Sequence, residues 1–175
     1  MHQPTLPECC LDPSTCCPSP RSQQSITIEV FYLDSNVCDR CRNTLAAVDD
    51  AVTLMKPVVS ALGYTLMVHR VHITSLSLAK RHRFVGSPTV RVNGRDVNEN
   101  IAEDSCLACG SLCGDSVTCR TFTYQGQTSQ ILPLGLMIET MMKALLSPSP
   151  HQDTTPYEVP ANLKRFFEGQ STKNP

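Results

Sequence analysis

The fold is decided by the stretch Ser25-Ile-Thr-Ile-Glu-Val-Phe-Tyr-Leu33 and by the segment that follows it, Val37-Cys38-Asp39-Arg40-Cys41. The first nine residues are rich in β-branched and aromatic side chains, which is typical of a strand. Apolar residues then recur at spacings of three and four from Leu45 to Leu62, which predicts a long helix. The two cysteines therefore lie where a strand ends and a helix begins.

The same reasoning, applied to the rest of the chain, predicts an α/β fold with a mixed central sheet flanked by helices. The further elements are strands over 64–73, 89–92, 120–124 and 128–131, a weaker helix over 75–83, and a helix that begins at Pro133. The strand–helix–strand–helix start favours parallel pairing, with an antiparallel hairpin closing the sheet. Residues 98–118 form a cysteine-rich insertion.

The chain length predicts one domain with tails. Residues 1–25 are rich in Pro, Ser, Gln and Cys without periodicity, which predicts a flexible cysteine-containing arm. We expect the domain over 26–146. A linker and a short C-terminal helix, over 162–168, complete the expected organisation in residues 147–175.

The bulk composition argues against nucleic-acid and membrane partners. The net charge is −1 and tryptophan is absent. The start of the chain does not resemble a signal peptide, and no apolar run approaches the roughly 20 residues that span a bilayer. We therefore expect a cytoplasmic protein whose ten cysteines are mostly reduced or metal-bound.

Cys38 and Cys41 form a candidate reactive dithiol. The amino terminus of a helix stabilises a thiolate through its free N–H groups and its dipole, so a cysteine there has a lowered pKa. We expect Cys38, nearest the helix start, to be the more exposed, attacking thiol, and Cys41 to resolve the mixed disulfide. The alternative is a pair of helix cysteines without reactivity.

The remaining cysteines fall in two further groups. Four thiols lie in the insertion or directly after it, at Cys106, Cys109, Cys113 and Cys119. They suit zinc or another soft ion, two local disulfides, a redox relay with the dithiol, or no bond at all. The adjacent pairs in the arm suit As(III), Hg(II), Cu(I) or zinc, or are incidental; they are Cys9-Cys10 and Cys16-Cys17.

A proline follows Gly86-Ser87 and precedes the strand over 89–92. X-Pro bonds adopt the cis form at low cost. A cis Pro88 would place the Ser87 backbone beside a bound thiol partner. The alternative is an ordinary turn proline.

Three segments resemble the thioredoxin-like superfamily and, more closely, a family of thioredoxin-like proteins of unknown function, over about residues 26–146. They are Phe31 to Thr44 with its Cys-Asp-Arg-Cys, Gly86-Ser-Pro-Thr-Val-Arg-Val-Asn-Gly94, and Cys106 to Arg120 followed by Tyr124-Gln-Gly126. The resemblance implies a thioredoxin fold, Cys38 and Cys41 as the active pair, and Pro88 as the cis proline. Thioredoxins proper differ from this chain in having Trp at Val37, Gly-Pro at Asp39-Arg40, and a buried acid at Tyr32.

Two functions follow as hypotheses. The first is a thiol-disulfide oxidoreductase that uses Cys38, Cys41 and Pro88 on a protein or small-molecule disulfide. The second is a protein that binds or delivers a metal or metalloid ion through thiolates, with Cys106, Cys109, Cys113 and Cys119 as its ligands.

Overall fold

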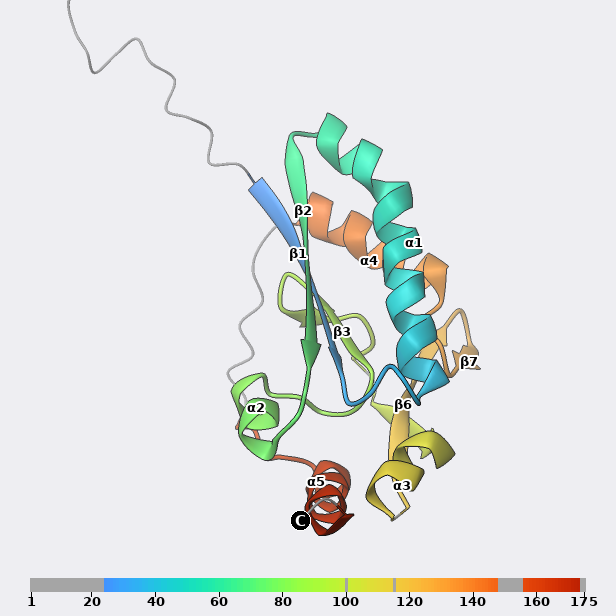
Figure 1. Cartoon of the computed structure of the whole chain (residues 1–175). Helices are drawn as coiled ribbons and strands as arrows, with labels where there is room; N and C mark the ends of the chain where they lie inside the picture. Colours follow the sequence, from blue (N-terminus) through green and yellow to red (C-terminus); the bar gives the residue numbers. More distant parts are fainter. Residues whose placement is uncertain (1–23, 100, 115, 148–155, 174–175) are drawn as a thin grey trace, which may run out of the picture.

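The central sheet of the computed structural model has four strands in the order β2-β1-β3-β4 (Figure 1). β1 (Gln24–Tyr32) pairs in parallel with β2 (Tyr64–His72) and antiparallel with β3 (Thr89–Val92), which pairs with the short β4 (Arg95–Asp96). The structure describes residues 24–99, 101–114, 116–147 and 156–173. The mixed sheet expected from the sequence is confirmed.

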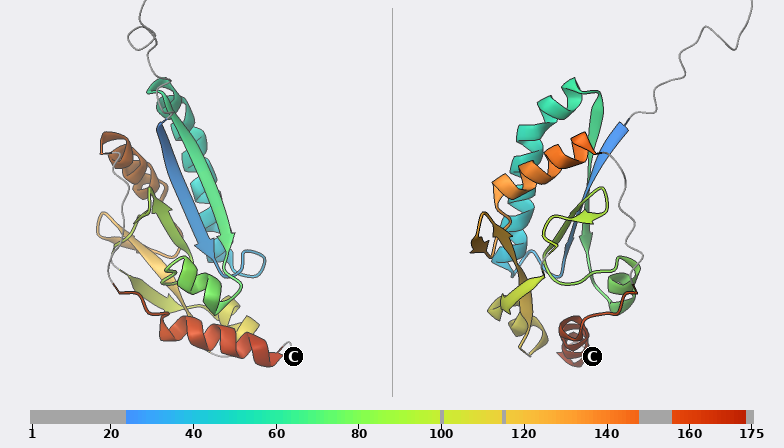
Figure 2. Two further views of the ribbon diagram at one scale, coloured as in Figure 1. Left: turned by 90° about the vertical axis from the view of Figure 1, so that its left-hand side faces the viewer. Right: turned by 180° about the vertical axis from the view of Figure 1, so that it is seen from behind.

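Two helices cover one face of this sheet. α1 (Asp39–Ala61) and α4 (Leu134–Leu146) lie side by side, α1 against β2 and α4 against β1 and β3 (Figures 1 and 2). Their apolar stripes face the sheet because residues three and four apart share one side of a helix. The buried side chains of this core include Ile26, Ile28, Val30, Val48, Met55, Val90, Met137 and Met141.

Glycines follow the end of α1 and close the β3–β4 hairpin. Gly63 follows the last turn of α1 at φ +80°, a conformation that costs glycine little. Asn93 and Gly94 have φ values of 50° and 81°, as a two-residue hairpin with both central residues left-handed requires. α2 (Leu76–Arg81) is short and begins at Ser75, whose hydroxyl accepts a hydrogen bond from the Leu78 N–H.

The cysteine-rich insertion contributes elements that the sequence did not reveal. β5 (Ala102–Ser105) and α3 (Leu107–Cys113) precede β6 (Thr118–Tyr124) and β7 (Gln127–Ser129), and the three strands form a second sheet in the order β5-β6-β7. The expected strands over 120–124 and 128–131 therefore belong to this second sheet. The Arg120 N–H donates to the Ser87 carbonyl at 2.8 Å, which ties β6 to the turn before β3.

A helix at the carboxyl end of the chain, α5 (Ala161–Lys173), packs on α3 and α2 (Figures 1 and 2). Leu163, Phe166 and Phe167 are buried there, within a second apolar core that also contains all six described cysteines. The carboxamide of Asn162 accepts from the Thr118 N–H at 3.1 Å and donates to the Thr118 carbonyl at 2.8 Å. The helix thus completes the enclosure of the cysteine-rich region.

Several expectations concern residues outside the described ranges. They are residues 1–23 of the expected arm, with Cys9, Cys10, Cys16 and Cys17, and residues 148–155 of the expected linker; residues 24 and 25, expected in the arm, belong to β1. Among the described helices, none combines the length and apolarity that a membrane crossing requires.

Candidate thiolate site

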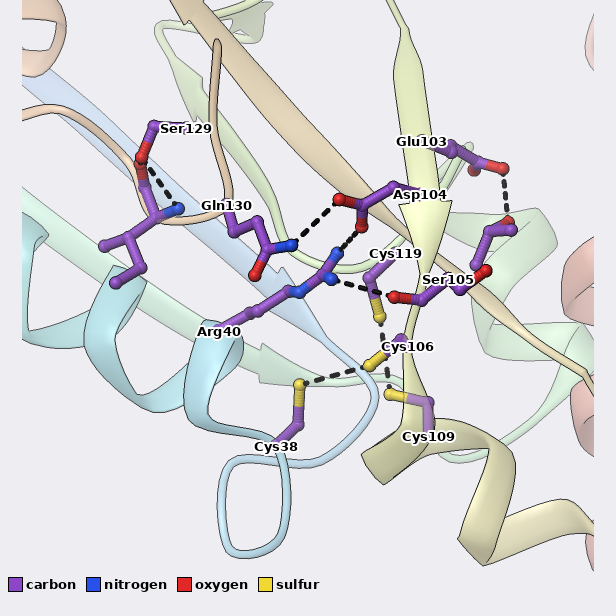
Figure 3. A network of polar contacts seen from close by, with 12 residues as sticks. Cys38, Arg40, Glu103, Asp104, Ser105, Cys106, Cys109, Cys119, Ser129 and Gln130 are labelled. Carbon is purple, nitrogen blue, oxygen red and sulfur yellow. Dashed lines mark hydrogen bonds and ion pairs between the residues drawn. The ribbon is translucent and has the colours of Figure 1, made fainter.

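Four cysteine sulfurs meet where α1 begins. The Sγ atoms of Cys38, Cys106, Cys109 and Cys119 all lie within 4.8 Å of one another (Figure 3). Cys38 and Cys106 are 3.9 Å apart, and Cys109 and Cys119 are 3.4 Å apart. All four residues are buried, with at most 6% of their surface exposed. The group is a compact sulfur-lined site beneath the surface.

Three segments of the chain supply these sulfurs. Cys38 is the N-cap residue of α1, Cys106 is the N-cap residue of α3, and Cys109 lies in the first turn of α3. Cys119 lies on β6, opposite Asp104 in the antiparallel pair of β5 and β6. The Cys106 N–H donates to the Val117 carbonyl at 2.9 Å, which fixes the start of α3 beside β6.

Arg40 connects the α1 side of the site to the β5 side (Figure 3). Its guanidinium pairs with the Asp104 carboxylate and donates to the Ser105 carbonyl at 2.8 Å. Gln130 donates to the other oxygen of Asp104 at 2.9 Å. Arg40 lies two residues after Cys38, and Asp104 lies two residues before Cys106. These contacts therefore fix the position of Cys38 relative to Cys106.

The sulfurs share their negative charge unevenly. Hydrogen bonds from the thiols of Cys106, Cys109, Cys119 and Cys41 hold the pKa of Cys38 far below its ordinary value. Hydrogen bonds from Cys109 and Cys119 lower the pKa of Cys106 to about 7. The pKa values of Cys109 and Cys119 are raised, first by their hydrogen bonds to Cys106. Cys38 is therefore the sulfur most readily present as a thiolate.

The donor set fits a soft metal ion. Four thiolates are the ligands of closed tetrahedral zinc sites, where Zn–S bonds of about 2.3 Å separate the sulfurs by about 3.8 Å. The Cys38–Cys106 and Cys109–Cys119 sulfur–sulfur distances, 3.9 and 3.4 Å, are close to that separation. The cluster therefore has the composition and spacing for either metal binding or thiol redox chemistry.

The expected dithiol opens α1, but it is not exposed. Cys38 and Cys41 are both 0% exposed, so the expectation of an accessible Cys38 is wrong. The insertion causes this, because α3 and β6 place Cys106, Cys109 and Cys119 against Cys38. The Cys41 sulfur lies 3.2 Å from the Ser87 hydroxyl. Hydrogen bonding to Cys38 and then burial raise the pKa of Cys41.

The structure places the other expected site residues as follows. The Ser87-Pro88 peptide is cis, and Pro88 is buried at the start of β3. Cys113 is not part of the four-sulfur group; its thiol donates to the carbonyls of Cys109 and Gly110, at 3.5 and 3.7 Å. The structure thus brings three of the four insertion cysteines together and adds Cys38 to them.

Sequence reasoning missed the polar residues that position the site. Arg40 and Asp104 are 64 residues apart, and no local pattern links them. The sequence offered two hints: a basic residue, Arg40, between Cys38 and Cys41, and an acidic residue, Asp104, shortly before Cys106. Neither hint shows that Arg40 and Asp104 pair with each other, because only the fold brings them together.

Comparisons with known proteins place the domain but give it no activity. Neither a curated protein nor a solved structure matches the chain. A family profile described as "Domain of unknown function (DUF2703)" matches residues 25–141, which include the four-sulfur group, α1 to α3 and the first part of α4. The chain therefore belongs to the DUF2703 family.

Proposed function

We propose that this protein binds a soft metal ion through Cys38, Cys106, Cys109 and Cys119, with zinc as the first candidate. The observation that carries the proposal is the approach of four buried sulfurs from three separate segments to within 4.8 Å. A closed four-thiolate site leaves no position open for a substrate, as in structural and storage sites. The proposal is therefore binding or delivery of the ion.

The charge of the site supports the same conclusion. Four thiolates repel one another in a buried setting, so a bound cation is needed to stabilise them together. The amino terminus of the 23-residue helix α1 adds a partial positive charge at Cys38. As(III), Hg(II) and Cu(I) share the preference for thiolates and are the other candidate cargoes.

A thiol-disulfide oxidoreductase on a thioredoxin-like scaffold is the second candidate function. It is favoured by the position of Cys38 and Cys41 at the strand-to-helix junction, with the Cys41 sulfur 3.2 Å from Ser87 in the turn before β3. The burial of both sulfurs places this candidate second, because a protein disulfide must reach Cys38 to react. Both functions require reduced thiols, and we place the protein in the cytoplasm on that ground.

Zinc loading tests the first proposal. In a background variant with Cys9, Cys10, Cys16 and Cys17 changed to Ser, we expect one zinc ion per chain by elemental analysis. The variant Cys119→Ser in that background should lose at least about tenfold in zinc affinity, since a ligand is removed. Competition with a chromophoric chelator measures this loss.

Cys113→Ser is the matched control, because Cys113 is equally buried, lies in the same region and is outside the four-sulfur group. It should leave zinc affinity unchanged. The proposal is overturned if the background variant takes up no zinc, or if Cys113→Ser weakens zinc binding as strongly as Cys119→Ser.

Insulin reduction tests the second candidate. Turnover with a dithiol donor that disappears in Cys38→Ser and persists in Cys113→Ser would support an oxidoreductase. An unmodified, metal-free protein that gives no turnover removes this candidate.

A further inference from the structure

Cys41 is a fifth buried sulfur beside the four-sulfur group. It lies one helical turn after Cys38 on α1 and is 0% exposed. Its sulfur is 3.2 Å from the Ser87 hydroxyl, which in turn accepts a hydrogen bond from the Leu33 N–H at 3.1 Å. Metal binding through the other four cysteines leaves the Cys41 thiol without a ligand role.

Cys38 takes part in two arrangements. On one side its sulfur faces Cys106 at 3.9 Å, and on the other Cys41 follows one helical turn later on α1. Residues three apart in the first turn of a helix have Cα atoms about 5 Å apart, within the range that a disulfide bridges. A sulfur in a disulfide is no longer a thiolate and is lost as a metal ligand. The two arrangements of Cys38 are therefore mutually exclusive.

We propose that oxidation of Cys38 and Cys41 to a disulfide by a hydroperoxide releases the metal ion from the four-sulfur group. This inference rests on the proposed metal binding and adds its regulation. The three remaining sulfurs, on Cys106, Cys109 and Cys119, cannot complete a four-ligand shell. The affinity for the ion therefore depends on the redox state of the pair.

The chemistry balances with hydrogen peroxide as the oxidant. The Cys38 sulfur attacks one peroxide oxygen and the O–O bond breaks, giving a sulfenic acid and a hydroxide that takes up a proton to become water. The Cys41 sulfur then attacks the Cys38 sulfur. The S–O bond breaks, and the departing hydroxide takes the Cys41 proton as a second water. Two thiols lose two electrons, and one peroxide is reduced to two waters.

The buried sulfurs can be reached by a small oxidant such as hydrogen peroxide. The cysteines themselves are buried, but their chain neighbours Val37 and Leu107 are 46% and 91% exposed. The sulfurs of Cys38 and Cys106 therefore lie just beneath the surface. Peroxide reaches such a depth more easily than a folded protein disulfide.

The test adds one equivalent of hydrogen peroxide to the zinc-loaded full chain carrying Ser at positions 9, 10, 16 and 17. We expect a zinc-responsive dye to report release of the ion, and peptide mapping to find a Cys38–Cys41 disulfide. Dithiothreitol should restore zinc binding. Cys41→Ser should bind zinc as tightly as the background protein and release it at least about tenfold more slowly, because the sulfenic acid has no resolving thiol.

Cys41→Ala serves as a second variant if the serine disturbs the core, and Cys113→Ser is the control that should release zinc at the background rate. The inference is overturned if Cys41→Ser releases zinc as fast as the background protein. It is equally overturned if mapping finds a disulfide between Cys109 and Cys119, the pair at 3.4 Å. Failure of the background protein to bind zinc, measured before peroxide is added, instead identifies failure of the proposed function.

Discussion

At the scale of single residues, two arginines near the start of α1 have contrasting positions. Arg40 has a side chain that is 12% exposed and joins α1 to Asp104 and Ser105 beside the four-sulfur group. Arg42 pairs with Asp39 on the surface, where both side chains are more than half exposed. Exposed pairs of this kind contribute little to stability. The Arg40 side chain reaches β5 and so bears on where Cys38 and Cys106 lie relative to each other, whereas the Arg42 side chain contacts only its own segment, at Asp39 and the Asn36 carbonyl.

We predict that Arg40→Ala weakens zinc binding by about 10- to 100-fold, the usual effect of removing a group that orients metal ligands. Arg42→Ala, the matched control, should change the affinity little. Chelator competition on both variants measures the difference. Equal effects of the two substitutions would contradict a positioning role for Arg40.

Arg120 is the second informative residue, because a fully buried guanidinium must be paired. It is 0% exposed and binds the Asp96 carboxylate at 2.7 and 3.2 Å. It also donates to the Thr89 hydroxyl at 2.9 Å and to the Asn98 carbonyl at 2.8 Å. One side chain next to Cys119 thus links the second sheet to β3 and β4.

We expect Arg120→Met to lower the free energy of unfolding by about 3–5 kcal/mol, since it leaves the Asp96 carboxylate without its partner. Urea titration measures this free energy of unfolding. The midpoint should fall while the slope of the free energy against urea concentration stays unchanged. Removing Asp96 as well, with Asp96→Asn, should recover part of the loss. A loss no larger than that of Arg95→Ala, which breaks the exposed pair with Glu99, would count against this assignment.

At the scale of elements, the contact between α3 and α5 holds the cysteine-rich region in place. Gly169 on α5 approaches the backbone of Cys113 at the end of α3, and a Cβ added at Gly169 would lie 2.3 Å from the Cys113 carbonyl oxygen. Glycine is therefore required at position 169, because α5 and α3 approach each other too closely there for a side chain. The sequence pattern 161–173 alone does not reveal this requirement.

We predict that Gly169→Ala lowers the melting temperature, although alanine favours a helix over glycine by about 1 kcal/mol. The overlap with a backbone carbonyl costs about 1–3 kcal/mol and outweighs that gain. Thermal unfolding followed by circular dichroism measures the shift, with the exposed Glu168→Ala as control. An increase in melting temperature would show that the two helices move apart freely.

At the scale of the whole molecule, the protein has two apolar cores in different places. One lies between the central sheet and the helices α1 and α4. The other contains the six described cysteines and is closed by Leu163, Phe166 and Phe167 of α5. Residues 25–141 match the family, so α5 lies outside the matched region, yet it packs on α3, the helix that carries Cys109.

We expect Phe166→Ala to destabilise the protein by about 3–5 kcal/mol, the usual cost of removing a buried aromatic ring. It should also speed the transfer of zinc to a chelator, because α3, which carries Cys109, loses packing against α5. Stopped-flow measurement of transfer gives the rate, and Arg165→Ala on the exposed side is the control. Lower stability with an unchanged transfer rate would limit α5 to a role in folding.

The insertion shows where local patterns stop being informative. Strands and helices with clear periodicity, such as β1, α1 and α4, are found where the sequence predicts them. β5 and α3 were missed because they are short, four and seven residues, and carry no apolar period. Their position comes from pairing with β6 and packing on α5, which are long-range contacts.

By itself the sequence determined the mixed sheet and the placement of Cys38 and Cys41 at the start of α1, because periodicity and turn residues act over a few neighbouring positions. Only the tertiary structure decided which sulfurs meet. Cys38 joins Cys106 across 68 residues. Cys113 instead directs its thiol to the backbone of its own helix. The physical reason is that sulfur contacts depend on how α3 and β6 dock against α1, and docking is set by burial and buried ion pairs far apart in the chain.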